Sequence, residues 1–278
     1  SVAQCSPALT TIFHNHERKA MLKFSKANAK IEALAKVPEL AQYLEGNRKV
    51  YSFDLLSGFS CPFAEKCLSK AVQIDGKRKI KDGPKTEFRC FSASQEVQYT
   101  NVYNLRKGNF DAIRQHKDAF DMCKDIVNAM PDNAGIVRIH VAGDFFNEKY
   151  FKAWMMVAHL CPSRLFYAYT KSLDYWLNNK SLIPKNLILT ASRGGRLDHK
   201  INLYNLRESV VVFSEKEAES LNLVIDHDDS HAARPSLEND SFALLIHGTQ
   251  PKGTEAANAL KILKRDKVKH SYSRKVTV

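Results

Sequence analysis

Residues 136–170 read IVRIHVAGDFFNEKYFKAWMMVAHLCPSRLFYAYT. The stretch begins with an apolar run over 136–141 and ends with another over 165–169. Between them, over about 147–160, apolar side chains recur at helical spacing. A helix flanked by two short apolar strands is typical of a parallel strand pair joined by a right-handed crossover. The stretch therefore predicts one strand–helix–strand unit.

The same alternation continues toward the C-terminus. The further elements expected there are helix 172–180, strand 187–191, strand 210–213, helix 214–223, strand 242–247 and helix 254–264. At least five such units favour a single α/β domain over residues 1–278, built as a complete or partial (β/α) barrel. A doubly wound parallel sheet is the other architecture that this alternation allows.

The N-terminal part of the chain has a different pattern. Residues 1–48 are expected to form an N-terminal helical segment, with one or two helices over 17–45 that are interrupted near Pro38. A strand is expected from Val50 to Leu56, and helical spacing returns over 110–130. The basic tail, Lys261 to Lys275, is expected to be a surface helix end and a strand.

Residues 57–92 are expected to be a cysteine-bearing loop and hairpin inserted before the alternating units. The part over 70–90 contains Asp75-Gly76, which is a strong signal for a hairpin turn. The basic residues of this hairpin are expected to be solvated; they are Lys77, Arg78, Lys79 and Lys81.

Three of the six cysteines gather in this insertion. Cys61 and Cys67 have five residues between them, and Cys90 follows after 22 more. In a reducing cytosol, cysteines close in sequence favour metal binding or catalysis over disulfides. Three thiolates on one loop system could ligate a 4Fe–4S cluster or a zinc ion. The alternative is three buried cysteines that act as small hydrophobic residues.

The other cysteines fit this site less well. Cys161 is expected at the end of a helix just before a strand, on the face opposite the site. Cys123 is expected in the middle of a helix, packed in the core, whereas Cys5 lies near the start and could reach either face. Three cysteine ligands would leave one iron of a cluster open to solvent, substrate or another ligand.

Residues capable of chemistry follow several expected strands. His140 lies near the end of the first strand of the alternating region, and Asp144 follows that strand. Lys171 follows the second strand and Arg193 the third, and the last strand ends near His247 and Gln250. The carboxyl ends of parallel strands meet at one mouth, where a cluster and a ligand could also meet.

Each of the four candidate catalytic residues also has a structural interpretation. His140 could be a hydrogen-bonded core residue, and Asp144 could cap the helix that follows it. Lys171 could be a solvated residue at the start of a helix. Arg193 precedes Gly194-Gly195 and resembles an anion-holding turn, although a pair of glycines is weak evidence.

Five motifs, in order, resemble a family of uncharacterised bacteriophage proteins, the mycobacteriophage gene-product-eighty-eight type. They are GFSCPFAEKCLS, FRCFSAS, VRIHVAGDFFNEKYFKAW, FYAYTKSL and TASRGG, between residues 57 and 195, and FSKANAKI at 24–31 resembles the N-terminal part of the family. The resemblance implies a phage origin and a role for the three motif cysteines. It implies no particular activity.

The layout of strands and cysteines is also similar, more distantly, to radical SAM barrels. Those enzymes resemble one another in a C-x3-C-x2-C loop, whereas Cys61, Cys67 and Cys90 are spread over 30 positions. This departure puts SAM binding in doubt while leaving a shared architecture open.

The composition points to a globular protein with anionic partners. Hydrophobic residues make up 44% of the 278 residues, and the net charge is +12. A basic balance favours nucleic acid, phosphate-bearing metabolites or acidic proteins, although a merely basic surface is the plainer interpretation. No apolar run approaches the roughly 20 residues that span a bilayer, so no membrane partner is expected. We expect a location in the host cell cytoplasm, because the start of the chain has no apolar signal-peptide core.

These features favour a non-redox iron–sulfur enzyme. An open iron could polarise an oxygen of a small-molecule substrate, with Asp144 or His140 as base and Lys171 or Arg193 as anion holder. The expected reaction is hydrolysis of a small ester-like or carboxylate substrate. Two alternatives remain open. One is an enzyme that carries out radical chemistry with SAM. The other is a non-enzymatic protein whose cluster only stabilises the fold and whose basic surface binds nucleic acid.

Overall fold

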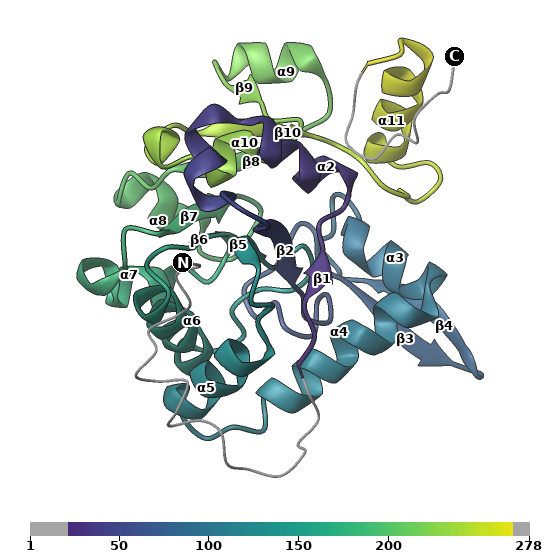
Figure 1. Cartoon of the computed structure of the whole chain (residues 1–278). Helices are drawn as coiled ribbons and strands as arrows, with labels where there is room; N and C mark the ends of the chain where they lie inside the picture. The colour runs from purple at the N-terminus through teal and green to yellow at the C-terminus, as the bar shows by residue number, and fades with distance from the viewer. Residues whose placement is uncertain (1–21, 269–278) are drawn as a thin grey trace.

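The computed structural model of the chain describes residues 22–268 and is built on one mostly parallel sheet (Figure 1). Eight strands are described in this sheet, and in spatial order they are β1 (Ser25–Lys26), β2 (Lys49–Phe53), β5 (Ala134–Ile139), β6 (Leu165–Thr170), β7 (Leu187–Ser192), β8 (Glu208–Val212), β10 (Phe242–Leu245) and β9 (Val224–Ile225). Every neighbouring pair is parallel except β1 with β2, which is antiparallel.

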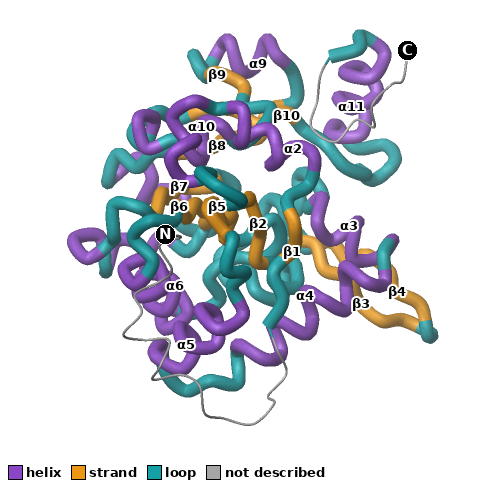
Figure 2. Tube along the Cα trace, viewed as in Figure 1, coloured by secondary structure: helices purple, strands orange, loops and turns teal. Residues whose placement is uncertain are grey.

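Helices connect most successive strands of this sheet (Figure 2). The α-helices described are α2 (Ala29–Glu32), α3 (Phe91–Gln98), α4 (Thr100–Ile113), α5 (Ala119–Ala129), α6 (Glu148–Leu160), α7 (Leu173–Asn178), α8 (Asp198–Leu203), α9 (Glu215–Ser220), α10 (Ser230–Ala233) and α11 (Glu255–Arg265). Short 3₁₀ helices are η1 (Ala33–Lys36), η2 (Pro38–Tyr43), η3 (Lys180–Leu182) and η4 (Pro235–Leu237).

The strand order can be compared with the two expected architectures. From β2 to β10 the parallel strands lie side by side in the order in which they occur in the chain. A doubly wound sheet reverses its order at a switch point, and this sheet has no such reversal among those strands. Within residues 22–268 the sheet ends at β1 on one side and β9 on the other, so the complete barrel among the expectations is not seen there.

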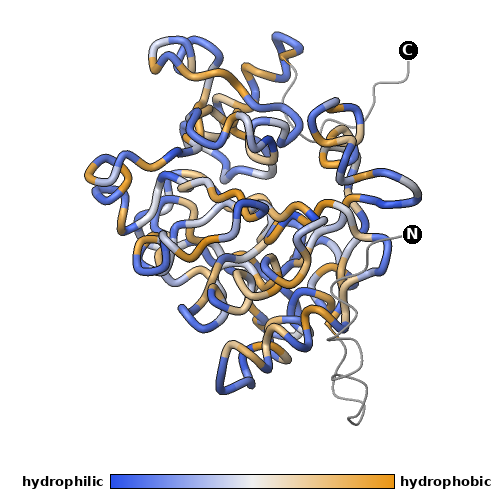
Figure 3. The backbone as a smooth tube through the Cα atoms, turned by 60° about the vertical axis from the view of Figure 1, so that its left-hand side comes forward, coloured by the Kyte–Doolittle hydropathy of each residue, from blue (hydrophilic) through white to orange (hydrophobic). Residues whose placement is uncertain are grey.

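Both faces of the sheet are covered. Side chains alternate along each strand, so Val137 and Phe166 point to one face and Ile136 and Tyr167 to the other. Helices α5 and α6 cover the first face, and α10 covers the second together with the segment from α2 to η2. In Figure 3 the hydrophobic stretches run through the centre of the molecule, and hydrophilic ones lie on outlying loops.

A two-stranded hairpin stands apart from the sheet. β3 (Ser69–Ile74) pairs antiparallel with β4 (Lys77–Asp82), which confirms the hairpin and its turn at Asp75-Gly76. Both turn residues have positive φ, 51° and 74°, as a tight two-residue hairpin turn requires.

Two expectations for the helical segments were wrong in part. Ser25–Lys26 is a strand and not helix, since Phe24 packs on Phe53 and so holds this extended segment at the sheet edge, with ring centroids 5.0 Å apart. The helical pattern over 110–130 belongs to two helices, because Asp118 accepts a hydrogen bond from the Asp121 N–H and starts α5 there.

Some predictions fall outside the described part of the chain. The residues concerned are 1–21, with Cys5, and 269–278, with the end of the basic tail. Among residues 22–268, no helix combines the length and the apolar character that a membrane span needs.

Candidate functional site

The loop that carries Cys61 and Cys67 lies across the carboxyl ends of the parallel strands. Its backbone is bonded to the loop after β7: the Lys66 N–H donates to the Gly194 carbonyl at 2.9 Å, and the Arg196 N–H donates to the Phe63 carbonyl at 2.9 Å. It also passes close to the loop after β5, where a Cβ at Gly143 would lie 2.6 Å from the Ser60 hydroxyl. Only glycine fits at position 143, which explains physically why a glycine precedes Asp144 in this loop.

Cys90 reaches the same place from the hairpin. It is the residue that precedes α3, and its N–H donates to the Ser69 hydroxyl at 3.3 Å. The loop after β10 holds this segment, because the Gln250 side chain bonds both the N–H and the carbonyl of Arg89. The mouth of the sheet therefore contacts the cysteine segments from β5 through to β10.

The three thiols lie within electrostatic reach of one another. Burial raises the pKa of Cys61 well above its usual value, and the charges of Asp144, Cys90 and Cys67 raise it further. Burial raises the pKa of Cys90 to about 11, again with Cys67 as a neighbour, although N–H groups of α3 oppose the shift. Ionisation of one thiol therefore disfavours ionisation of its neighbour, and a bound cation would offset the repulsion between the thiolates.

The side chains as they stand do not enclose a single ion. In residues 22–268, no three His, Cys, Asp or Glu side chains have the spacing of a metal site. The structure therefore brings the three cysteines into one region without forming a closed metal cage from them.

Asp144 is buried among hydrogen-bond donors. Its carboxylate accepts from the Thr170 hydroxyl at 2.6 Å, the Lys171 N–H at 2.8 Å and the Phe145 N–H at 2.7 Å. Burial raises its pKa, and these three donors oppose the rise. It does not cap α6, because Asn147 does so by accepting from the Tyr150 N–H at 2.8 Å. Asp144 joins the loops after β5 and β6, next to Cys61.

Lys171 is buried, so it is not the solvated residue of the simpler interpretation. Its ammonium donates to the Ser192 hydroxyl at 2.6 Å, the Ser192 carbonyl at 3.0 Å and the Arg193 carbonyl at 3.3 Å. Three acceptors match its three protons, so in this state the ammonium holds the end of β7.

Arg193 and the glycines after it are also engaged. The guanidinium pairs with Glu208 and donates to the Asn202 side chain at 2.8 Å. The N–H groups of Gly194 and Gly195 donate to the Asp198 carboxylate, each at 2.8 Å. The turn does hold an anion, and in this structure that anion is the chain's own Asp198.

His140 lies in the core beneath the mouth. It is 3% exposed, and its Nε2 lies 3.0 Å from the Tyr150 hydroxyl. Burial, with a smaller effect of Arg138, lowers the pKa of His140 to about 3. Its Nδ1 is buried with no hydrogen-bond partner in the described structure. His140 is therefore a neutral imidazole near pH 7.

The profile of one family matches nearly the whole chain. It is described as Gene product 88 and covers residues 21–268. The chain belongs to this phage family. Neither the search of curated proteins nor the search of solved structures found a match. The match extends the resemblance from the five motifs, between residues 57 and 195, to residues 21–268.

Two buried acids close to the mouth of this Gene product 88 protein were missed from the sequence. Asp54, directly after β2, accepts from the N–H groups of Val141 and Ala142 at 2.6 and 3.2 Å. Asp54 therefore joins β2 to the loop after β5, as Asp144 joins β5 to the loop after β6. Its position directly after an apolar strand was a usable signal, which the expected strand Val50 to Leu56 concealed.

The second missed acid is Glu96, in α3. It accepts from the Ser57 N–H and hydroxyl at 3.0 and 2.7 Å and from Arg106 at 3.2 Å. Glu96 and Arg106 are both buried, and they fasten the start of the cysteine loop to α3 and α4. No motif marks either residue in the sequence.

A cavity of about 360 Å³ opens beside the cysteine segments. Its wall includes Lys66, which precedes Cys67, and Phe88, which lies two residues before Cys90. Cationic, anionic and apolar groups complete the lining, and they are Glu87, Arg193, Gly194, Val210, Val211, Phe213, Glu217 and Glu255.

The remaining cysteines of the described chain lie elsewhere. Cys123 is buried in the core between α5 and α6, as its helical position predicts. Cys161 follows α6 at the opposite edge of the sheet from the mouth, and it is disulfide-bonded, contrary to the general expectation for these cysteines. Neither belongs to the region of Cys61, Cys67 and Cys90.

Proposed function

We propose that the chain is an iron–sulfur protein whose 4Fe–4S cluster is held by Cys61, Cys67 and Cys90. One observation carries the proposal: three cysteines from separate positions in the sequence come together at the mouth of the sheet, close enough for neighbouring thiols to raise the pKa values of Cys61 and Cys90. A zinc ion binds its thiolates directly, at Zn–S distances of about 2.3 Å. A four-iron cluster is larger than one ion, so it holds its thiolates farther apart than a zinc site does. Zinc is the alternative metal.

The surroundings favour chemistry over a purely structural cluster. A structural metal site usually closes with four protein ligands, and three cysteines leave one position open. When bound, such a cluster supplies a Lewis acid that polarises a substrate oxygen. The adjoining cavity would take a small ester-like or carboxylate substrate, and its cations Lys66 and Arg193 would have to leave their present partners Glu87 and Glu208 to hold an anion.

Asp144 is the residue best placed to move a proton there. It lies near enough to Cys61 for their charges to interact, and burial raises its pKa toward the range that suits a general acid or base. Lys171 and Ser192 would orient the loop after β7 beside the substrate. His140 is a weaker candidate, since its lowered pKa makes it a poor base at neutral pH.

Radical chemistry with SAM is the second candidate. Its support is the consecutive order of parallel strands, which is the order of a partial barrel. The wide spacing of the three cysteines counts against it. Under either proposal the protein would act in the host cell cytoplasm.

Anaerobic purification, followed by iron and sulfide analysis and an absorption spectrum, tests the cluster directly. We expect about four iron and four sulfide ions per chain and a broad brown absorption. Zinc without iron, in protein purified anaerobically and reconstituted with iron and sulfide, would contradict the iron–sulfur assignment.

Turnover of activated esters tests the proposed chemistry. The cluster-loaded protein should hydrolyse them, and Asp144→Asn should lower the rate while leaving the cluster spectrum unchanged. Asp54→Asn is the matched control, because it removes a similar carboxylate link between a strand end and the neighbouring loop. Equal turnover by folded apoprotein would rule out iron as the Lewis acid. Formation of methionine and 5′-deoxyadenosine on reduction with SAM would favour the second candidate.

A further inference from the structure

One face of the β3–β4 hairpin carries a row of lysines. Along β4 exposure alternates, with Lys77, Lys79 and Lys81 exposed and the residues between them half-buried. Alternate residues of a strand share a face, so the three ammonium groups lie on the same side of the hairpin. Figures 1 and 2 show the hairpin projecting from the body of the molecule beside α3 and α4.

The partner strand adds a fourth lysine to this face. Lys70 lies directly opposite Lys81, while Val72 faces Lys79 and Ile74 faces Lys77. Like charges directly opposite each other in an antiparallel pair are destabilising. The sequence therefore keeps a repulsive pair where a neutral residue would stabilise the hairpin, which points to a use for the charge.

Little in the described chain neutralises this face. The ion pair found there joins Lys79 to Asp75 at 3.9 Å, and the Asp75 side chain is 90% exposed. An exposed ion pair of that kind contributes little to stability and leaves most of the positive charge of the face in place. The acid at the end of β4, Asp82, belongs to the other face and pairs with Arg89 at 2.6 Å.

The opposite face of the hairpin is packed, which holds the lysines outward. The Arg78 guanidinium donates to the Glu96 carbonyl at 3.0 Å and to the Thr100 hydroxyl at 2.6 Å, and it lies over the Tyr103 ring. Ala71 is buried on the same side. The lysine row is thus a rigid feature of the fold.

The row leads back to the cysteine loop. The Lys70 ammonium lies 4.8 Å from the centre of the Phe59 ring, two residues before Cys61. Phe59 is 43% exposed, so its ring is accessible beside the lysine row. A basic strand and an exposed aromatic ring together are a common way of binding a nucleic-acid chain.

We propose that the face formed by Lys70, Lys77, Lys79 and Lys81 binds the phosphate backbone of a nucleic acid. A regular row of cations on a rigid strand matches a regular row of phosphates, whereas a single small anion would engage only one or two lysines. Binding is independent of base sequence, because the face offers charge and an apolar ring but few groups that could read bases. The proposal does not depend on the cluster.

A different explanation of the lysines is protection of the hairpin edges. Lysines on exposed strands discourage pairing with other chains. That explanation predicts that their removal causes self-association and leaves nucleic-acid binding unchanged, so the two explanations give opposite results.

Fluorescence anisotropy with a labelled single strand and the matching duplex tests the proposal. The variant Lys77→Gln/Lys79→Gln/Lys81→Gln should weaken binding on the order of 10- to 100-fold and reduce the salt slope by about 2 to 3. The matched control is Lys180→Gln/Lys185→Gln/Lys216→Gln, which removes the same charge from exposed lysines of η3, the following loop and α9. The comparison between single strand and duplex identifies which form binds.

Three results would overturn the proposal. One is an equal loss of affinity in the control variant, which would mean that net charge alone binds the nucleic acid. Another is self-association of the hairpin variant with unchanged affinity. The third is binding to anionic phospholipid vesicles through the same lysines without binding to either nucleic acid. Each assay is run on the full chain with and without reconstituted cluster, so failure here is distinct from failure of the iron–sulfur proposal.

Discussion

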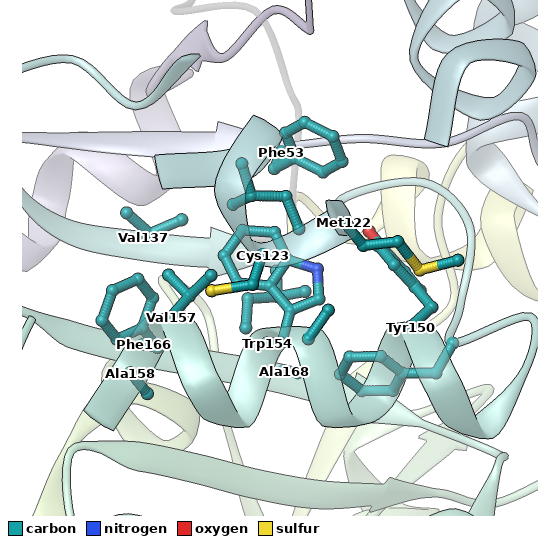
Figure 4. Close-up of a cluster of buried hydrophobic side chains, with 14 of the residues drawn as sticks. Phe53, Met122, Cys123, Val137, Tyr150, Trp154, Val157, Ala158, Phe166 and Ala168 are labelled. Atoms are coloured by element: carbon teal, nitrogen blue, oxygen red, sulfur yellow. The ribbon is translucent and has the colours of Figure 1, made fainter. Parts of the chain in front are cut away.

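The described free cysteines lie in two contrasting places. Cys123 lies between α5 and α6, in a cluster that includes Trp154 and Phe166 (Figure 4). Burial alone raises the pKa of Cys123 to about 12. At the mouth, by contrast, Cys61 and Cys90 are shifted both by burial and by neighbouring charges. A cation would change little at Cys123, whereas at the mouth it would reverse a repulsion among several groups.

The largest expected difference between the two places is in cluster binding. Cys61→Ser, Cys67→Ser and Cys90→Ser should each abolish the brown absorption of the reconstituted protein, because each removes one of three ligands. Cys123→Ser and Cys161→Ser should keep it, because those residues lie away from the mouth. Absorption spectra and iron content after identical anaerobic reconstitution provide the measurement. Iron retained by all three mouth variants would show that the cluster, if present, is held elsewhere.

The next largest effect concerns His140, which lies where the mouth meets the core. The pKa of His140 is about 3 in the folded protein against 6.5 for the free side chain, so the unfolded chain binds the extra proton first. The stability that this neutral histidine contributes is present above pH 6.5 and is lost as the pH falls toward 3. Across that window the loss is on the order of 5 kcal/mol.

His140→Asn should flatten this part of the pH dependence. Asparagine tolerates the positive φ of 72° at this position, and other titrating groups cancel in the difference between the two proteins. Urea unfolding of both proteins at a series of pH values gives that difference. Parallel curves for the two proteins would mean that His140 is not buried in the neutral form.

A substitution of Glu96 tests whether a buried ion pair stabilises the mouth, as apolar packing stabilises the core. Glu96→Gln leaves the buried Arg106 without its counter-ion and should cost on the order of 3 kcal/mol of unfolding free energy. The control is Asp111→Asn, which breaks surface pairs with Lys107 and Arg114 and should cost less than about 1 kcal/mol. Similar costs for the two variants would mean that the mouth is open to water at Glu96.

Much of the fold could be predicted because its signals are local. Over 134–265, each predicted strand and helix rests on its own apolar run or helical spacing, and each is present with small shifts at the ends. The strand Ser25–Lys26 was not predicted, since it exists through pairing with Tyr51 and Ser52, and no pattern within two residues reports a distant partner. The two-residue strand β9 was missed for the same reason.

The candidate site could be predicted only as a set of residues at strand ends. The order of the strands brings Asp144, Lys171 and Arg193 to one edge, as expected from parallel pairing. What each side chain bonds to was not predictable, because those partners are backbone groups of loops whose shapes depend on the whole fold. Asp144 and Lys171 each bond the loop after the next strand, so both serve the architecture of the mouth as well as any chemistry there.

The smallest expected effect is at Cys123, and it tests whether the surroundings of this core cysteine are apolar. Cys123→Ser is nearly the same shape, but it places a hydroxyl among apolar side chains and should cost about 1–3 kcal/mol. Cys123→Ala removes the sulfur and leaves a small void, which should cost about 1 kcal/mol. Serine should therefore destabilise the protein more than alanine does, although serine resembles cysteine more closely.

Helix propensity also favours alanine over serine, so the comparison needs a correction. The same two substitutions at Asn128, an exposed position of α5, measure that preference alone. Urea unfolding of the four variants gives the burial effect at Cys123 as the excess of its serine–alanine difference over that at Asn128. An excess near zero would mean that Cys123 has a polar neighbour or water within reach. The contrast with the mouth would then rest on the charges around Cys61 and Cys90 alone, because burial in apolar surroundings would no longer set Cys123 apart.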